Sequence, residues 1–390
     1  MSALFGLRSA VLAVAAAAAF GGAAQSAAAD WPALAIGPER ARVAEPTWIG
    51  NAGDGSGRVF VAERRGRVVV FGGERAGAGT FLDIAERVNA TKGGLRTLAF
   101  PFDFVDKRNF YVSYAAATGD LVIARFRLAR DGAAADPASE QILLRVPLAG
   151  GARPGGGLAF GFDGKLYVGV GEGATTPGAP GAAAQSLASL AGKILRIDVG
   201  TATSPYAAPP DNPWARKPDA RPEIWALGLS SPSALTVDAR TGDVYIVDAP
   251  GERWSEIDVQ AGTSAGGENY GWDVLDARDC RAPGSCAKTG FVMPAETLAT
   301  SKDCALTAGA ISAGGDNPQL EGIFFFGDRC SGRLRGLRRT PAGAWESRIL
   351  LRGKLKIAAV GAAEDGRIFV ADAGTGRVLE VVPAKGSGRP

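Results

Sequence analysis

One pattern recurs six times along the 390-residue chain and constrains its fold more than any other feature. Each copy reads as a turn, a strand centred on an aromatic residue, a second turn often opened by an acid, and a second apolar strand, as in GRVFVAERRGRVVVF from Gly57. The six central aromatic residues are Phe60, Tyr111, Tyr167, Tyr245, Phe325 and Phe369. Strand pairs repeated about every 60 residues, without a long helical period, are typical of propeller blades. One blade cannot bury both of its faces, so the copies are expected to pack in a ring.

The repeat therefore predicts an all-β protein, a six-bladed β-propeller with long inter-strand loops that spans residues 30–390 as a single domain. A β-sandwich fits less well, because its strands recur about every 8 to 12 residues without a longer period. Wide gaps between copies leave room for long loops at residues 174–184, 200–222 and 276–307. Loops of such length usually carry a site or an interface.

The first 29 residues are typical of a secretory signal peptide. Arg8 is their only charge, residues 10–20 are apolar, and Ala27, Ala28 and Ala29 are small residues suited to cleavage before Asp30. A membrane anchor is the alternative, but the apolar run is shorter than the ~20 residues that span a bilayer. The expected location is the periplasm or the exterior, without a membrane anchor.

Four cysteines, Cys280, Cys286, Cys304 and Cys330, lie within one stretch of the chain. Export favours disulfides, and three connectivities are possible. We favour Cys280–Cys286, which closes a Pro-Gly turn, and Cys304–Cys330, which joins two strand-rich segments. A four-thiolate zinc site is the rival, although no CxxC pair occurs. In either case the cysteines are expected to be structural.

The chain contains no histidine. This absence excludes Ser-His-Asp and Cys-His nucleophiles, histidine-ligated zinc and a histidine general base. Any enzymatic chemistry must use carboxylates, Lys, Tyr, a cofactor or an oxygen-bound metal. The net charge of +3 gives no indication of a nucleic-acid partner or an anionic membrane surface.

Several long segments resemble the glucose/sorbosone dehydrogenase family. They include RPGGGLAFGFDGKLYVGVGEG, QSLASLAGKILRIDV, RPEIWALGLSSPSALTVDARTGDVYIVD, GGENYGWDVLD and DGRIFVADAGTGRVLEVV, and the match covers nearly all of residues 45–383. The resemblance implies an exported six-bladed propeller, related to soluble aldose dehydrogenases that use pyrroloquinoline quinone (PQQ). The implied reaction oxidises a sugar or polyol hydroxyl compound by hydride transfer to PQQ.

The resemblance also locates a catalytic base position that has changed. Family members that act on sugars carry the basic histidine just before the GGG sequence, where this chain has Arg153. Arginine stays protonated in proteins and is not an ordinary general base. Glu172 stands where the family has an Asp beside the base. It is the candidate catalytic carboxylate, although a turn carboxylate that accepts backbone N–H groups is the plainer interpretation.

The resemblance implies changes at the quinone contacts as well. The family's Arg-Asn pair, which holds the quinone's acidic groups, is Ser230-Ser231 here, and a Gln or Arg contact is Gly93. Lys354 and Lys356 keep the spacing of the family's quinone-binding arginines and are expected on the same side of a strand. A solvated strand face is the alternative for both lysines. Arg153 is either a surface charge or an anion-binding residue at the channel mouth.

A calcium site is implied by the stretch from Asp248 to Glu256 and by Tyr270, which resemble the family's calcium loop. Glu256 and main-chain carbonyls, including those of Pro250 and Tyr270, would supply hard oxygens, and Asp276 would complete the set. The alternative is that Glu256 pairs with a cation such as Arg253.

Two functions follow. The first is a PQQ- and calcium-dependent dehydrogenase in which Glu172 acts as the base, with Lys354, Lys356 and Arg153 holding the quinone. The second is a catalytically inactive propeller that binds a carbohydrate, peptide or protein partner through its loop face. A calcium-dependent lactone hydrolase fits less well, because no converging set of carboxylates is evident.

Overall fold

The computed structural model describes residues 30–74, 77–148, 153–173, 183–200, 205–249, 252–282, 284–300 and 305–384. The described residues from Trp31 onward belong to one compact unit. Six four-stranded antiparallel sheets make up this unit, and we number them as blades 1 to 6 in chain order.

The strands of each blade run from the inside outward. Blade 1 contains β2 (Pro46–Asn51), β3 (Arg58–Glu63), β4 (Arg67–Gly72) and β5 (Gly79–Asp83). Blade 2 contains β6 (Leu95–Ala99), β7 (Asn109–Ala115), β8 (Leu121–Leu128) and β9 (Ala135–Val146). Blade 3 contains β10 (Gly155–Phe160), β11 (Leu166–Val170), β12 (Lys193–Ile197) and β13 (Ile224–Leu227).

Blade 4 contains β14 (Pro232–Val237), β15 (Val244–Asp248), β16 (Trp254–Gln260) and β19 (Glu296–Ala299). Blade 5 contains β20 (Ala310–Ile311), β21 (Phe324–Asp328), β22 (Arg333–Arg339) and β23 (Trp345–Arg352). Blade 6 contains β24 (Ile357–Ala362), β25 (Ile368–Asp372), β26 (Arg377–Pro383) and, outermost, β1 (Leu34–Arg42). The described helices are short: α1 (Phe104–Lys107) and 3-10 turns at Ala85–Arg87, Ala90–Lys92, Ala183–Gln185 and Pro318–Leu320.

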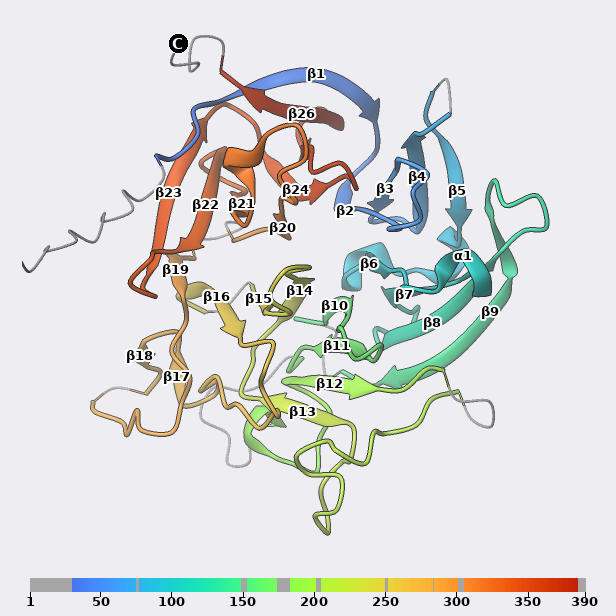
Figure 1. Ribbon diagram of the computed structural model, residues 1–390. Helices are drawn as coiled ribbons and strands as arrows, with labels where there is room; N and C mark the ends of the chain where they lie inside the picture. Colours follow the sequence, from blue (N-terminus) through green and yellow to red (C-terminus); the bar gives the residue numbers. More distant parts are fainter. Residues whose placement is uncertain are drawn as a thin grey trace, which may run out of the picture. The chain divides into compact units, whose positions relative to one another are not determined.

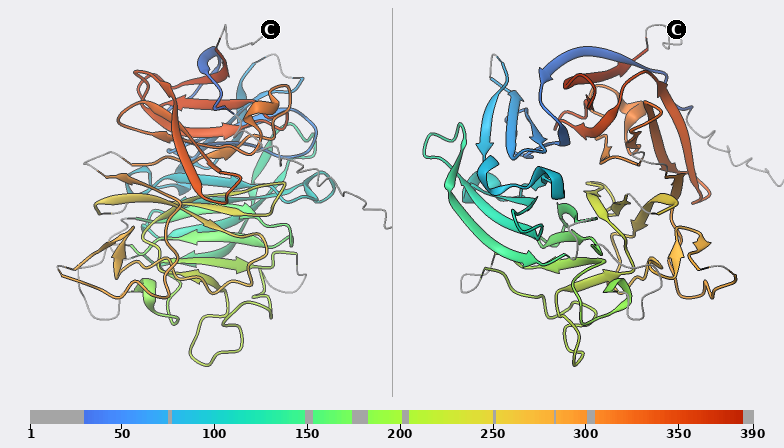
Figure 2. Two further views of the ribbon diagram at one scale, coloured as in Figure 1. Left: turned by 60° about the vertical axis from the view of Figure 1, so that its left-hand side comes forward. Right: turned by 180° about the vertical axis from the view of Figure 1, so that it is seen from behind.

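The innermost strands form a closed ring. β2 contacts β6, and contacts continue through β10, β14, β20 and β24 back to β2. Figure 1 shows the six sheets around this centre, and the view from behind in Figure 2 shows the same order. The first strand of the described residues closes the ring, because β1 pairs antiparallel with β26 in blade 6. The predicted six-bladed β-propeller is confirmed.

The repeated aromatic residues explain why the blades pack in this way. All six lie in the second strand of a blade, and all are buried. Each belongs to an apolar cluster shared with the next blade; Phe60, for example, packs with Phe110 of blade 2, and Phe369 packs with Ile49 of blade 1. Six such clusters fill the six interfaces between neighbouring blades. Buried aromatic rings supply large apolar area, so the repeat seen in the sequence is the repeat of inter-blade packing.

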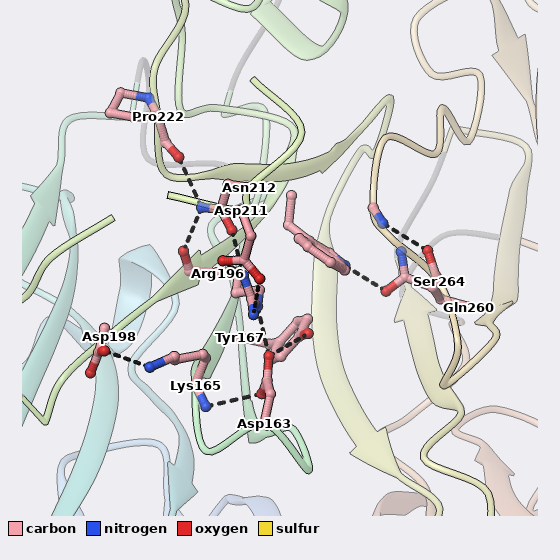
Figure 3. A network of polar contacts seen from close by, with 12 residues as sticks. Asp163, Lys165, Tyr167, Arg196, Asp198, Asp211, Asn212, Pro222, Gln260 and Ser264 are labelled. Atoms are coloured by element: carbon pink, nitrogen blue, oxygen red, sulfur yellow. Dashed lines mark hydrogen bonds and ion pairs between the residues drawn. The ribbon is translucent and has the colours of Figure 1, made fainter. Parts of the chain in front are cut away.

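A polar network fastens one of the predicted long loops to blade 3. The Arg196 side chain donates to Asp163, Asp211 and Asn212, with nitrogen–oxygen distances of 2.7 to 3.1 Å. Asn212 returns hydrogen bonds to the Arg196 and Pro222 carbonyls. Figure 3 shows Asp163, Asp211 and Asn212 around Arg196, with Pro222 on the far side of Asn212. The described part of the 200–222 loop is therefore anchored to β12.

The long segment after β16 has some structure of its own. It contains a two-stranded sheet of β17 (Leu275–Asp276) and β18 (Asp279–Cys280) before β19 returns to blade 4. The disulfide Cys280–Cys286 is present as predicted. Cys330 is also in a disulfide, but Cys304 lies outside the described residues, so the Cys304–Cys330 pairing stays a prediction.

The expected signal peptide, residues 1–29, lies outside the described residues. Within the described ranges, we find no helix with the length and apolar character needed to cross a membrane.

Candidate functional site

The predicted site residues gather at one face of the ring. In every blade the first strand begins beside the end of the second strand, as Pro46 pairs with Glu63 in blade 1 and Ile357 pairs with Asp372 in blade 6. We call this end of the ring the strand-start face. Arg153 precedes β10, Glu172 follows β11, Ser231 precedes β14 and Lys356 precedes β24, so all four lie on it.

Arg153 is held over an aromatic ring. Its guanidinium carbon lies 5.3 Å from the ring centroid of Trp272, and Arg281 approaches the same ring at 4.6 Å. Glu252 lies between the two cations, 3.8 Å from Arg153 and 2.8 Å from Arg281. These contacts hold both guanidinium groups in place.

The backbone that carries Arg153 is tightly constrained. Arg153 has a φ of 47°, in the left-handed region, and a Cβ atom built on Gly171 would lie 1.8 Å from its carbonyl oxygen. Only glycine at position 171 allows this approach. Gly93, the changed quinone-contact position, packs against the neighbouring Pro154, because a Cβ there would lie 2.9 Å from that ring.

Glu172 is buried and already engaged. It is 3 % exposed, one carboxylate oxygen accepts from the Trp272 indole, and the other accepts from the Ala184 amide at 3.4 Å. Its charge also faces Lys193, whose pKa burial lowers to about 7. Lys193 in turn donates to three backbone carbonyls, those of residues 183, 184 and 191, at 2.6 to 2.9 Å. Glu172 therefore sits in a network that ties the 183–185 turn and Trp272 to blade 3.

Ser230 and Ser231 present their backbone amides to a carboxylate. Both amides donate to Asp248, at the end of β15, and both residues are buried. Asp372 performs the same task in blade 6 by accepting from the Lys356 amide at 2.8 Å. This repeated contact shows that Asp248 fixes the start of a first strand. The Ser230 and Ser231 hydroxyls are buried without a hydrogen-bond partner in the described part of the chain.

A buried group of acids lies on one face of blade 4. Glu256 and Asp258 are two residues apart on β16 and pair across to Asp248 and Ile246 of β15. Burial, together with the neighbouring acids, raises the pKa values of Glu256 and Asp258 well above their ordinary range, and burial raises that of Asp248 to about 6. Asp258 is fully buried, and neither of its carboxylate oxygens has a hydrogen-bond partner among the described residues.

Tyr270 lies next to this acid group. It is 1 % exposed, its hydroxyl has no hydrogen-bond partner within the described residues, and burial and the charge of Asp258 raise its pKa. One oxygen of Glu256 is unpartnered in the same sense. These hard oxygens have the chemistry of a calcium site. Still, no group of three acidic or thiol side chains in the described ranges is arranged to hold a metal ion by itself.

The remaining predicted calcium ligands are placed differently. Asp276, in β17, accepts from the Arg253 amide at 2.8 Å and from its side chain at 3.3 Å. The alternative for Glu256 was an ion pair with a cation such as Arg253. Arg253 instead pairs with Asp276. Pro250 lies outside the described residues. Calcium binding by this set stays a prediction.

Lys354 and Lys356 do not lie in a strand. β24 begins at Ile357, so both lysines belong to the loop that precedes it, and the premise that they share one side of a strand is wrong. Both are exposed. Their loop packs on the turn after β21, where a Cβ on Gly332 would lie 2.5 Å from the Leu355 carbonyl oxygen.

Sequence reasoning missed two parts of the candidate site. One is Trp272 with its two arginines, which come together from segments more than 100 residues apart. The other is Asp258, for which a signal did exist: the alternation in WSEIDV puts Glu256 and Asp258 on one strand face.

A sequence profile of the glucose/sorbosone dehydrogenase family matches residues 44–380. Curated relatives include Hedgehog-interacting protein of Mus musculus, 27% identical over 334 residues, which cover 79% of this chain and 44% of that protein. An aldose sugar dehydrogenase of Escherichia coli (strain K12) is 26% identical over 239 residues, covering 60% of this chain and 58% of the relative. The chain thus spans less than two thirds of the length of either relative.

Solved structures agree with the fold. The PQQ-bound form of an aldose sugar dehydrogenase from Streptomyces coelicolor superposes with a TM-score of 0.70 at 20% identity, covering 89% of this chain and 97% of that one. At this identity the likeness supports the fold alone. The profile match covers most of the chain, and the protein belongs to the glucose/sorbosone dehydrogenase family.

Proposed function

We propose that this protein binds a small ligand at the strand-start face of its propeller and oxidises aldoses weakly or not at all. The observation that carries this proposal is that no side chain at the family's base position is free to accept a proton. Arg153 is a cation stacked on Trp272, and the carboxylate of Glu172 is already engaged.

Oxidation of a sugar hydroxyl needs a group that accepts its proton. Arginine does not serve, because its pKa keeps it charged. Glu172 would first have to release the Trp272 indole and the Ala184 amide, to which its two oxygens are bonded. The adjoining segments 149–152 and 174–182 contain only Ala, Gly, Thr and Pro, so they supply no alternative base.

The cationic groups of this face fit the acidic groups of a quinone cofactor. Lys354 and Lys356 are exposed there, and Arg153 lies across the face beside Trp272. PQQ, when bound in a dehydrogenase, supplies the acceptor for the substrate's hydride. Ser230 and Ser231 are poorer candidates for holding it, because Asp248 takes both of their amides.

The blade 4 acids fit a divalent cation in their chemistry. Glu256 and Asp258 bring unpartnered, buried oxygens whose charged form is unfavourable without a counter-charge. A bound calcium ion would supply that counter-charge and fix β16 against the loop that carries Tyr270.

A PQQ-dependent sugar dehydrogenase is the second candidate function, favoured by the family match over residues 44–380. A protein-binding role is the other form of the inactive alternative. It is favoured by the likeness to Hedgehog-interacting protein over 79% of this chain. In either case we propose that the protein acts after export, since a Cys280–Cys286 disulfide is typical of oxidising compartments.

The test uses the mature protein with calcium and PQQ, a redox dye and a panel of aldoses, beside the E. coli aldose sugar dehydrogenase as reference. We expect dye reduction at least about 100-fold below the reference, the usual contribution of a positioned base. Thermal unfolding with the same ligands reports binding independently. Turnover equal to the reference, and lost in a Glu172→Gln variant, would establish the dehydrogenase instead.

A further inference from the structure

Lys193 is a buried cation that binds the backbone of a turn. It is the first residue of β12 and is 0 % exposed, and its ammonium donates to the carbonyls of residues 183, 184 and 191 at 2.6, 2.9 and 2.7 Å. A lysine ammonium has three N–H donors and no acceptor, so these three carbonyls satisfy it completely. The 3-10 turn Ala183–Gln185 is therefore bound by a side chain from the interior of blade 3.

Glu172 supplies the counter-charge and binds the same turn. Burial lowers the pKa of Lys193 to about 7, and within the described ranges the one charge that opposes this lowering is that of Glu172. The Glu172 carboxylate accepts from the Ala184 amide at 3.4 Å, while Lys193 binds the Ala184 carbonyl. Two buried opposite charges thus fix one residue at both its amide and its carbonyl. Removing either charge would leave the other buried without compensation.

Gln185 connects the turn to the segment that carries Trp272. Its side-chain amide donates to the Trp272 carbonyl and, at 3.0 Å, to the Asn269 side chain, which returns a hydrogen bond at 2.8 Å. The backbone of Gly228 adds a second connection, because its amide donates to a carbonyl of the turn at 3.1 Å and its carbonyl accepts the Trp272 amide at 2.9 Å. Trp272 is therefore fixed by its backbone to the turn that the lysine binds.

The indole ring of Trp272 carries a cation of the candidate site. Its N–H donates to Glu172, and the Arg153 guanidinium carbon lies 5.3 Å from the ring centroid. A cation stays over an aromatic face only while the ring keeps its orientation. Contacts therefore continue without a break from Lys193 through the turn and Trp272 to Arg153.

We propose that Lys193 is a positioning residue: it orders the 183–185 turn, and through the turn it sets the position of the Trp272 ring and of Arg153. This inference rests on the proposed function, because Trp272 and Arg153 belong to the face at which we propose that a ligand binds. Glu172 then serves as the counter-ion of Lys193 and as the acceptor of the Trp272 indole, and not as a base.

The test follows the indole N–H of Trp272, because this proton lies in the contact with Glu172. Nuclear magnetic resonance of isotope-labelled protein resolves the indole protons, and the signal missing in Trp272→Phe assigns the one of interest. Its exchange with water, measured without ligand, reports how often the contact opens. In Lys193→Met the carbonyls of the turn lose a buried donor, so we expect exchange to be at least about fivefold faster, the effect of leaving a buried polar group unsatisfied.

Two control variants in the same blade separate positioning from general stability. Lys165→Met removes a lysine that pairs with Asp198 at the other end of β11 from Glu172. Val168→Ala removes buried apolar contacts of β11 and lowers stability without changing a hydrogen bond of the network. Both are expected to leave the exchange as in wild type. Acceleration by Val168→Ala equal to that by Lys193→Met would mean a general loss of stability and would overturn the positioning role.

A second variant tests whether Lys193 acts through the turn. Gln185→Leu removes the amide that binds the Trp272 carbonyl, so exchange of the indole proton should again be faster. In Lys193→Met/Gln185→Leu the combined effect should be smaller than the product of the single effects, because both residues act through one turn. Effects that multiply in full would show independent action and contradict the proposed path.

Lys193→Met leaves Glu172 buried without a counter-charge, so this variant is at risk of failing to fold. Lys193→Met/Glu172→Gln removes both charges, and Glu172→Gln alone is its reference. The same acceleration is expected against that reference, and its absence would refute the role of Lys193.

Binding of PQQ, measured by thermal unfolding, tests the proposed function separately. If PQQ fails to stabilise the wild type while Lys193→Met exchanges faster, ligand binding is wrong and the positioning of Trp272 stands. If PQQ binds and exchange is the same in Lys193→Met as in wild type, the positioning role alone is wrong.

Discussion

Arginine appears in two contrasting settings in this protein. Arg196 is surrounded by acceptors: Asp163, Asp211 and Asn212 share its guanidinium, and its charge also faces the Trp225 ring at 4.8 Å. Burial alone would lower its pKa, but the hydrogen bonds to Asp211 and Asp163 outweigh burial and raise the pKa above its ordinary value. At the strand-start face, by contrast, burial and the charge of Arg329 lower the pKa of Arg64, and burial and the charge of Arg64 lower that of Arg96 to about 10. The Arg96 side chain donates to the carbonyls of Gly155 and Gly93.

The difference separates charges that stabilise the fold from charges that are available to a ligand. A buried cation with a complete set of acceptors contributes to the native state, and its removal leaves those acceptors unpaired. A cation held beside like charges costs stability until a ligand supplies the opposite charge. The acid group of blade 4 likewise places like charges close together, but these charges are negative, so a cation would relieve their repulsion.

The largest effect is expected at the paired arginine. Arg196→Gln leaves Asp163 and Asp211 without their partner and loosens the described part of the 200–222 loop, so the free energy of unfolding should fall by about 2–4 kcal/mol. Urea denaturation measures the change. Arg216→Gln, an exposed residue of the same loop, is the control and should change stability by less than about 0.5 kcal/mol. A loss no greater than that of the control would show that the network is dispensable.

The acid group should make stability depend on pH. Because the pKa of Asp248 is raised to about 6, and those of Glu256 and Asp258 are raised well above normal, the folded protein keeps protons that the unfolded chain releases near pH 4. The free energy of unfolding should therefore fall as pH rises from about 4 through 6 and beyond.

Chemical denaturation in EDTA, across pH 4 to 8, measures this slope. Asp258→Asn should flatten it and raise the free energy of unfolding at pH 8 by about 1–3 kcal/mol, because an unpaired buried charge is removed. Added calcium should recover part of the loss in wild type and less in the variant. Stability that rises with pH through this window would contradict the reasoning.

The smallest effect is expected at Arg64. Arg64→Gln removes a partly buried charge that Arg329 repels more than Glu45 attracts. Its melting temperature at low ionic strength should therefore exceed that of wild type by a few degrees, corresponding to about 0.5–1 kcal/mol. The difference should shrink in high salt, which screens the repulsion. A variant less stable than wild type would place Arg64 among the stabilising cations with Arg196.

The sequence was sufficient to predict the ring of blades but not the arrangement of the charged side chains at the strand-start face. The blades could be predicted because the same aromatic position, occupied by Phe60 in blade 1, recurs in every blade and packs in each of the six interfaces. The Cys280–Cys286 bond could be predicted because it is local. The effect of Arg329 on Arg64 could not be predicted, since the two residues are far apart in sequence and only ring closure brings their charges within range. Lys354 and Lys356 were placed in a strand because their spacing alone does not reveal where β24 begins.

The pairing of β1 with β26 has a consequence for how the chain matures. The strand at the N-terminal end of the propeller finds its neighbour only in the final strand of blade 6. During synthesis, therefore, five blades are complete before the sixth acquires its outer edge, and the edge of β26 stays open to foreign strands until β1 docks. An export step that carries the chain unfolded through the membrane would postpone this docking until the whole chain has crossed. Residues 34–42 then close the ring by pairing with β26. A tag or truncation that disturbs either strand of this pair would destabilise the closure of the whole ring.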